Sequence, residues 1–440
     1  MVRTLIGFLL LGLVTACGSD ANAPAPVRLQ VFGDPLELRA YRELIASYEA
    51  LQPGAKVELI PVGRQTDHMA KLSTAFAAGD PPELFVLNFR RFGQFADKRV
   101  LTALGPAMTA SGQFHEDEFY TPAIEAFRYQ GELVCLPQNV SSLVVYYNRA
   151  LFRHAGVPYP APGWHLHQLL GAAQAISKKA PRPQGQVTYG LGFEPTLIRL
   201  AAFIWGFGGE LVDSTENPKR IRIDGPALSA LRFVKFLNGT YGVVPPLAAY
   251  KSEDHESRFA RGALGMLLQS RRFTASLRQT PNLDWDVAPF PIVYGKPVSV
   301  LHADAYCQAA SARDPAAAQR FVAYALSAEG QGILTRSGRL VPSRKTVAQS
   351  PVFLDPAQPP ASAQVFLDAI PSLRRTPNIA AWHEIESKAD VLLEEWFYES
   401  ATGGAGGAGE EREGGRTNQI FAAHLRRELQ TILQPGPPAP

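Results

Sequence analysis

Polar and aromatic side chains directly follow three short apolar runs near the start of the chain: Asp34, Arg64, Asn88, Phe89 and Arg90. Carboxylate and amide groups of this kind hydrogen-bond the hydroxyls of a bound molecule, and a ring face packs against its apolar side. An arginine can also bind a carboxylate or a phosphate through two parallel hydrogen bonds. These residue types are suited to holding a polar ligand, provided that the fold brings them together.

The runs that precede these residues are typical of β-strands, at 27–32, 57–62 and 84–87. Between them, 36–51 and 68–77 carry apolar side chains at the spacing of amphipathic helices. A β-α-β-α-β order predicts a parallel sheet with crossover helices. Because ligands bind beyond the carboxyl ends of the strands in such sheets, we expect the polar and aromatic residues to share one rim.

A second polar group interrupts the stretch GELVCLPQNVSSLVVYYNR, residues 131–149. Two β-prone apolar runs, 133–136 and 143–147, enclose a gap that contains Gln138 and Asn139. The two amides either shape a turn after the preceding proline or face a ligand. The pattern of residues leaves both interpretations open.

The chain has 440 residues, which is long for one ordinary core and favours two lobes. Its formal net charge of +3 creates no large basic field, so nucleic acid is not an expected partner. The sequence has no GxSxG, HExxH or P-loop lysine motif, which argues against an enzyme. Carboxylates are plentiful, but no pair of them is marked by its spacing as the acid and base of a glycosidase.

Cysteine and histidine spacing predicts no metal site and no cofactor. Cys135 and Cys307 have no CxxC or neighbouring histidine pattern. His165 and His167 are two residues apart and therefore lie on different faces of a helix.

The N-terminus predicts export from the cytoplasm. Arg3, an apolar run at 5–14 and small residues before Cys17 are typical of a secretory signal peptide over 1–16. The letters LVTAC resemble a bacterial lipobox, in which the cysteine is acylated and becomes the mature N-terminus. Cys17 would then carry a lipid anchor and 17–26 would form a tether, unless an ordinary signal peptide contains an incidental cysteine. The expected location is the cell envelope, on the outer side of the cytoplasmic membrane.

Several stretches, in this order, resemble one protein family: KLSTAFAAGDPPELFVL, RRFGQFADKRVLTAL, GELVCLPQNVSSLVVYYNRALFRHAGV, FARGALGMLL, DWDVAPFPI, DPAAAQRFVAYALSAEGQ and SGRLVPSR. Each stretch alone is a weak signal, but their number, order and spacing resemble the bacterial extracellular solute-binding proteins of family 1, the sugar-binding components of ABC importers. The resemblance extends from Val27 to Leu433.

The resemblance implies an α/β protein with the two-lobed periplasmic-binding-protein type II fold, whose discontinuous lobes are joined by hinge crossovers. One lobe would comprise 27–135 and 307–342, and the other 136–302 and 343–433. Residues 402–415, rich in glycine, would form a flexible insert. The lobes would close around a ligand in the cleft.

The same resemblance places further residues at the cleft: Glu194, Thr196, Trp205, Arg271, Arg272, His302, Asp304, Tyr306, Trp382 and His383. It also places Gln138 and Asn139 on a crossover. Trp205 could instead be a core residue. Cys135 and Cys307 would lie on neighbouring crossovers, either as a disulfide or as buried free thiols.

The implied function is capture of a carbohydrate and its delivery to a membrane permease by a monomeric binding protein. Arg90, Arg271 and Arg272 depart from the residues usual in the family. They favour an anionic ligand such as a uronate or a glycerophosphate, unless nearby acids pair with them. A sensor that serves a signalling partner is a further alternative.

Overall fold

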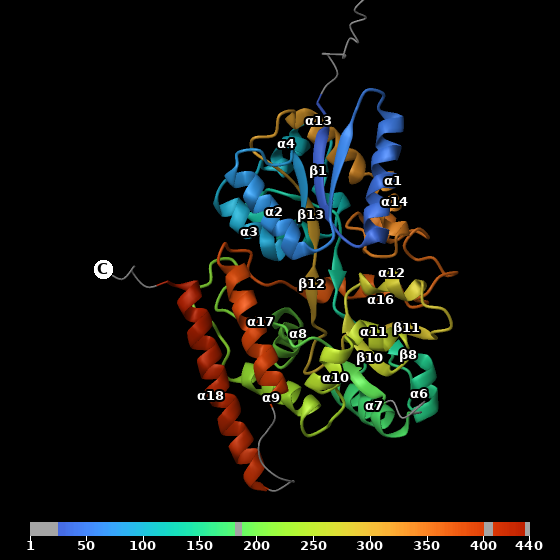
Figure 1. The fold of residues 1–440 in the computed structure, drawn as a ribbon, viewed down its shortest axis with the longest axis vertical. Helices are drawn as coiled ribbons and strands as arrows, with labels where there is room; N and C mark the ends of the chain where they lie inside the picture. Colours follow the sequence, from blue (N-terminus) through green and yellow to red (C-terminus); the bar gives the residue numbers. More distant parts are fainter. Residues whose placement is uncertain (1–24, 181–186, 400–407, 436–440) are drawn as a thin grey trace, which may run out of the picture.

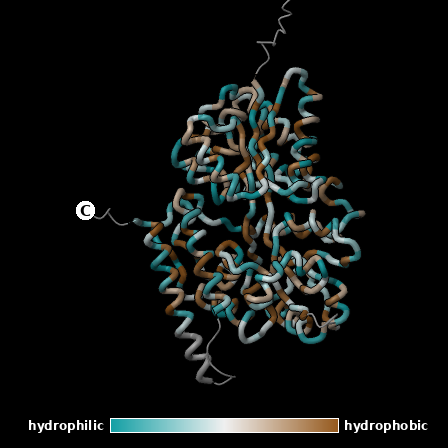
Figure 2. The backbone as a smooth tube through the Cα atoms, viewed as in Figure 1, coloured by the Kyte–Doolittle hydropathy of each residue, from teal (hydrophilic) through white to brown (hydrophobic). Residues whose placement is uncertain are grey.

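The computed structural model describes residues 25–180, 187–399 and 408–435, without the side chains of 408–416. Two lobes lie one above the other, and a narrow region connects them (Figure 1). Each lobe contains its own β-sheet, and a third, small sheet lies between the lobes. Hydrophobic segments gather inside both lobes, as the brown parts of the tube in Figure 2 show.

The upper lobe has a five-stranded sheet in the order β2-β1-β3-β13-β6. Its strands are β1 Val27–Phe32, β2 Val57–Val62, β3 Leu84–Asn88, β6 Leu136–Pro137 and β13 Asp304–Gln308. The first three strands pair in parallel, as the β-α-β-α-β order predicts, and β13 runs antiparallel to β3 and β6. Because β1 begins at the outer end of the lobe, the carboxyl ends of the parallel strands point to the lower lobe (Figure 1).

Helices cover this sheet, and residues from the strand ends begin two of them. The helices are α1 Pro35–Leu51, α2 Gln65–Ala77, α3 Phe89–Asp97, α4 Leu104–Ala110, α5 Thr121–Ala126, α13 Pro315–Ala325, α14 Ala328–Arg336 and α15 Lys345–Ala348. Asp34 caps α1 by accepting the N–H groups of Leu36 and Glu37 at 3.0 and 3.1 Å. Asn88 caps α3 in the same way, through the N–H of Arg90 at 3.2 Å.

The lower lobe has a four-stranded sheet in the order β11-β8-β10-β9. Its strands are β8 Val144–Asn148, β9 Tyr189–Gly192, β10 Leu264–Gln269 and β11 Trp285–Pro289. Its helices are α6 Arg149–Ala155, α7 Leu166–Lys179, α8 Leu197–Gly206, α9 Pro226–Asn238, α10 Leu247–Ser252, α11 His255–Ala260, α12 Phe273–Arg278, α16 Gln364–Asp368, α17 Trp382–Tyr398 and α18 Ala408–Leu433. The long α17 and α18 pack along one flank (Figure 1, red).

The connecting sheet has the order β14-β12-β7, with β7 Ser141–Ser142, β12 Ser299–His302 and β14 Leu373–Arg374. β7 runs antiparallel to β12, with Ser142 opposite Leu301. The polar gap of the 131–149 stretch is therefore a crossing between two sheets, because β6 pairs in the upper lobe and β8 in the lower one.

The lobe boundaries differ from the expected ones. β6 and all of β13 belong to the upper sheet, so residues 136–137 and 304–306 lie there and not in the lower lobe or the hinge. α15 packs on α14 of the upper lobe, whereas 343–433 was assigned to the lower lobe as a whole.

Cys135 and Cys307 form a disulfide, with their Cα atoms 4.6 Å apart. Both side chains are fully buried in the upper lobe, where β6 and β13 lie side by side. Of the two alternatives for these thiols, the structure has the bridge, and it joins the two crossing segments where they enter the upper sheet.

Residues 408–415 are helical, because α18 begins at Ala408. The prediction of a flexible insert at 402–415 is wrong for these residues. The remainder of the insert, like the signal peptide and Cys17, lies outside the described residues. In the described parts of the chain, none of the helices has the length and apolar composition needed to cross a bilayer.

Candidate functional site

The two lobes touch through an ion cluster that joins α3 of the upper lobe to α17 of the lower. Arg90 donates to Glu386 with an Nη1–Oε1 distance of 2.6 Å, and Arg91 lies 3.3 Å from the other carboxylate oxygen. The Glu386 side chain is only 1% exposed. An ion pair buried to this degree is strong only if both partners remain in place. The sequence leaves open whether Arg90 binds an anionic ligand or pairs with an acid of the protein. In the structure its partner is Glu386.

A second network lies at the hinge, around Asp304. Its two carboxylate oxygens each accept a side-chain N–H at 3.0 Å, one from Asn88 of β3 and one from Asn139 of the first crossing. The Asp304 backbone N–H returns a bond to the Asn139 amide oxygen at 3.1 Å. Burial raises the pKa of Asp304, and the two amides oppose that shift. Asn139 therefore faces this polar cluster from the first crossing.

Gln138 points the other way, into the upper lobe. Its amide oxygen accepts the hydroxyl of Tyr41 at 2.9 Å, and its carbonyl accepts the side-chain amide of Gln331 at 3.0 Å. The residue is almost fully buried. Its side-chain amide oxygen therefore bonds within the upper lobe, at the start of the crossing.

Asp34 and Glu37, at the start of α1, share one arginine. Arg339 pairs with the Asp34 carboxylate and lies 3.0 Å from Glu37 Oε2 through Nε. Burial raises the pKa of Glu37 to about 7, although the charge of Arg339 opposes the shift. Of these three residues, only Asp34 was predicted from the sequence.

The lower lobe contributes a chain of alternating charges. Glu194 lies 2.6 Å from Arg199, which donates to Gln269 at 3.2 Å. Gln269 in turn donates to Glu256 at 2.6 Å, and the same carboxylate oxygen accepts Arg272 at 2.6 Å. Arg272, like Arg90, is thus paired with an acid of the protein.

His302 lies between the walls of the two lobes. Burial lowers its pKa well below the usual value, and the charges of Arg90, Arg199 and Arg272 lower it further. These arginines come from both lobes, since Arg90 lies on α3 of the upper lobe and the other two belong to the lower lobe. Asp390 lies one turn after Glu386 on α17, and its carboxylate accepts the backbone N–H of Leu197 at 2.7 Å.

Several expected ligand contacts are core side chains: Phe89, Trp205, Tyr306 and Trp382. Trp205 packs in the lower core with Arg374 4.8 Å above its ring, so the core alternative holds for it. Arg271 is also buried, 1% exposed, with its guanidinium 4.7 and 5.0 Å from the rings of Phe353 and Phe366. These side chains lie in the cores of the lobes, because the position of a residue along the chain does not determine which face its side chain occupies.

The remaining candidates lie at the edges. His383 accepts a bond from Arg91 beside the ion cluster, and Thr196 precedes α8, where Arg199 approaches its hydroxyl at 3.4 Å. Arg64 is exposed before α2, and no ion pair of its side chain occurs among the described residues. Within the same ranges, no group of three His, Cys, Asp or Glu side chains is arranged to hold a metal ion.

Sequence reasoning missed these charged or amide residues: Glu37, Arg91, Arg199, Glu256, Gln269, Arg339, Glu386 and Asp390. One signal was available, because Glu386 and Asp390 are four residues apart and lie on one face of a helix. The other residues come from segments without a recognisable motif.

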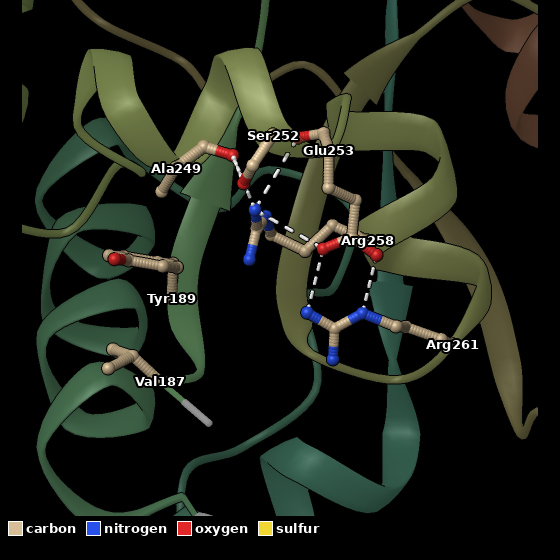
Figure 3. Close-up of a pocket in the computed structure, with 7 residues that line it drawn as sticks. All are labelled: Val187, Tyr189, Ala249, Ser252, Glu253, Arg258 and Arg261. Carbon is tan, nitrogen blue, oxygen red and sulfur yellow. Dashed lines mark hydrogen bonds and ion pairs between the residues drawn. The ribbon is translucent and has the colours of Figure 1, made fainter. Parts of the chain in front are cut away.

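A separate hollow of about 520 Å³ on the lower lobe contains two arginines (Figure 3). Both bind the same acid: Arg258 lies 3.2 Å from Glu253, and Arg261 donates to it at 2.7 Å. The carbonyl of Ala249 accepts another Arg258 N–H at 2.8 Å. This arrangement lies within one lobe, and its two arginines already share the carboxylate of Glu253, which makes the interlobe region the better candidate.

Two α/β lobes, joined by crossings and lined with hydrogen-bonding groups where they meet, define a solute-binding protein. Residues 43–361 match the model of the family described as bacterial extracellular solute-binding protein. The match spans more than half of the chain, and the chain therefore belongs to this family.

Relatives with similarity over nearly the full length include a protein of Brucella abortus described as a binding protein, 24% identical over 403 residues, 88% of this chain and 91% of that protein. An ABC substrate-binding protein from Listeria monocytogenes in complex with cycloalternan has a TM-score of 0.79 at 20% identity, covering 92% of this chain and 98% of that one. A protein of Mycobacterium tuberculosis in complex with glycerophosphocholine has a TM-score of 0.77 at 20% identity, covering 93% and 98%. At these identities, the solved structures support the fold and not the ligand.

Proposed function

We propose that the protein is the extracytoplasmic binding component of an ABC importer and encloses a neutral carbohydrate between its lobes. The ligand would contact the region where Asn88, Asn139, Asp304 and His302 meet the wall formed by Glu194, Arg199 and Arg272. Binding would occur without chemical change of the ligand, and a membrane permease would receive it.

The observation that carries this proposal is the pairing of the arginines near the cleft with acids of the protein. Arg90, Arg199, Arg272 and Arg339 each have a carboxylate within 3.0 Å. An anionic ligand would have to displace these carboxylates, whereas a hydroxyl group can donate to a carboxylate and accept from a guanidinium at the same time. These arginine–carboxylate pairs are therefore better matched to a polyhydroxyl ligand than to an anion.

Two findings favour the alternative of an anionic ligand. Arg64 is exposed at the rim, and one similar solved structure is a complex with glycerophosphocholine. A thermal-shift and calorimetric screen separates the two ligand classes. Neutral oligosaccharides are expected to raise the melting temperature and to bind Arg64→Ala as well as the parent chain. Stabilisation by uronates or glycerophosphodiesters alone, lost in Arg64→Ala, would replace the carbohydrate proposal.

Closure of the hinge would couple binding to transport. A ligand shifts the equilibrium between open and closed lobes by as much as it binds the closed form better. Small-angle scattering with an identified ligand is expected to show a smaller radius of gyration, and the ligand should be recovered unchanged by mass spectrometry. Deletion of the gene should abolish uptake of that ligand; loss of a transcriptional response with uptake intact would indicate the sensor alternative.

We also propose that Cys17 carries a lipid and that the chain acts as a monomer. Fatty-acid labelling of the full chain in a bacterial host should be lost in Cys17→Ala. Light scattering of the purified protein should give the mass of one chain. Labelling that persists in Cys17→Ala would remove the anchor from the proposal but not the binding function.

A further inference from the structure

A groove of about 810 Å³ lies on the flank of the lower lobe, between α18 and the loop that precedes α9. Its walls carry four cations, Lys219 and Arg220 from the loop and Arg426 and Arg427 from the helix. Among the described residues that line the groove, none is acidic. The residues that line the groove do not belong to the interlobe region described above.

Hydrogen bonds hold the two walls of the groove together. Gln430 of α18 accepts the N–H of Ile221 at 2.9 Å and donates to the carbonyl of Lys219 at 2.9 Å. The Asp213 carboxylate accepts the backbone N–H groups of Lys219 and Arg220 at 2.8 and 3.0 Å. The loop and the helix therefore present their cations from a preformed surface.

The cations of the groove are not neutralised in the way that other arginines of this chain are. Arg374 and Arg222 in the same lobe each pair with a carboxylate, at 2.6 and 3.4 Å. For the four groove cations, no ion pair with an acid occurs in the described ranges, and Arg427 instead contacts the His424 ring at 3.0 Å. Like charges gathered without counter-charges create a positive potential that attracts an anionic partner.

An exposed apolar side chain on the helix that forms one wall of the groove favours one class of partner over others. Ile420 is 63% exposed, and it precedes Ala423 and Arg427 by three and seven residues on the same face of α18. The cations of such a surface can contact anionic lipid head groups while an exposed apolar side chain beside them enters the interface of the membrane. An acidic protein segment would match the cations but would leave Ile420 without a partner.

We propose that this groove and Ile420 form a docking surface for an anionic lipid membrane. Lipid phosphates would occupy the groove among Lys219, Arg220, Arg426 and Arg427, while Ile420 enters the boundary of the acyl chains. The contact would hold the lower lobe beside the bilayer, independently of which solute the cleft takes.

Hydrogen–deuterium exchange of the full chain mixed with vesicles tests this docking. Backbone amides of 219–221 and 423–434 are expected to exchange more slowly with phosphatidylcholine vesicles that contain phosphatidylglycerol than with phosphatidylcholine alone. The protection should disappear at roughly 0.5 M salt, where charges are strongly screened. Because the measurement is local, an N-terminal apolar run that binds both kinds of vesicle does not produce the expected signal.

Charge-reversal variants test whether membrane binding depends on the groove cations or only on the net charge of the protein. In the double variant Arg426→Glu with Arg427→Glu, the lipid concentration needed for half-maximal protection should rise at least about 25-fold. Each cation lost is expected to weaken binding roughly fivefold. Arg42→Glu with Lys71→Glu changes exposed cations of the upper lobe by the same net charge and should have little effect. Equal protection on neutral vesicles, equal protection by polyglutamate, or no protection on anionic vesicles would each overturn the proposal.

Discussion

Replacing Glu386 by Gln should open the lobes without unfolding either of them. The carboxylate is 1% exposed and holds Arg90 at 2.6 Å and Arg91 at 3.3 Å across the interface. Removing one partner of a buried ion pair costs about 3–5 kcal/mol, mainly because the other charge stays buried and unpaired. When the lobes separate, the two guanidiniums regain water, so this cost applies to the closed form.

Because ligand is held in the closed form, its affinity should fall on the order of 10²- to 10⁴-fold. Isothermal titration calorimetry with the solute found by screening measures the change. Small-angle scattering of the ligand-free Glu386→Gln chain should show a larger radius of gyration than the parent chain.

The chain offers a matched control within one lobe. Glu253 also binds two arginines, Arg258 and Arg261, but all three residues lie in the lower lobe, and its side chain is 22% exposed. Glu253→Gln should lower the melting temperature and leave both the affinity and the radius nearly unchanged. If Glu386→Gln behaves like Glu253→Gln, the argument that the Arg90–Glu386 pair stabilises the closed arrangement is refuted.

Three further outcomes are expected. Cys135→Ser with Cys307→Ser should lose about 2–5 kcal/mol of unfolding free energy in urea titrations, because a loop spanning 172 residues is released, while ligand affinity changes little. Burial raises the pKa of Glu37 from its ordinary value of 4.5 to about 7, so the folded form binds a proton more tightly than the unfolded form. The resulting stabilisation is fully present below that ordinary value and is lost as pH rises from there through 7. Glu37→Gln should flatten the melting temperature over that window. Arg271→Ala should lower the melting temperature by removing the guanidinium packed on Phe353 and Phe366, without the change in affinity expected of a ligand contact; a large loss of affinity with an unchanged melting temperature would contradict the core position of Arg271.

Local signals in the sequence were sufficient for the frame of the upper lobe. Three strands alternating with amphipathic helices predicted a parallel sheet, and that order alone placed Asp34, Asn88 and Arg90 at the end that faces the other lobe. The polar gap between 133–136 and 143–147 was visible in the pattern, but only the family resemblance predicted a crossing there, and the structure shows β6 and β8 in different sheets. These predictions succeed because side-chain period and strand order are local properties of the chain.

The tertiary structure alone decided which polar groups are satisfied by the protein and which can serve a ligand. Arg271 and Arg272 are adjacent and chemically identical, yet one packs between two rings and the other pairs with Glu256. Arg90 and Glu386 are 296 residues apart, and only the packing of α17 against α3 brings them together. A residue's type and its neighbours determine the element that carries it, but its electrostatic partner is set by the contact of distant elements, which no local pattern encodes.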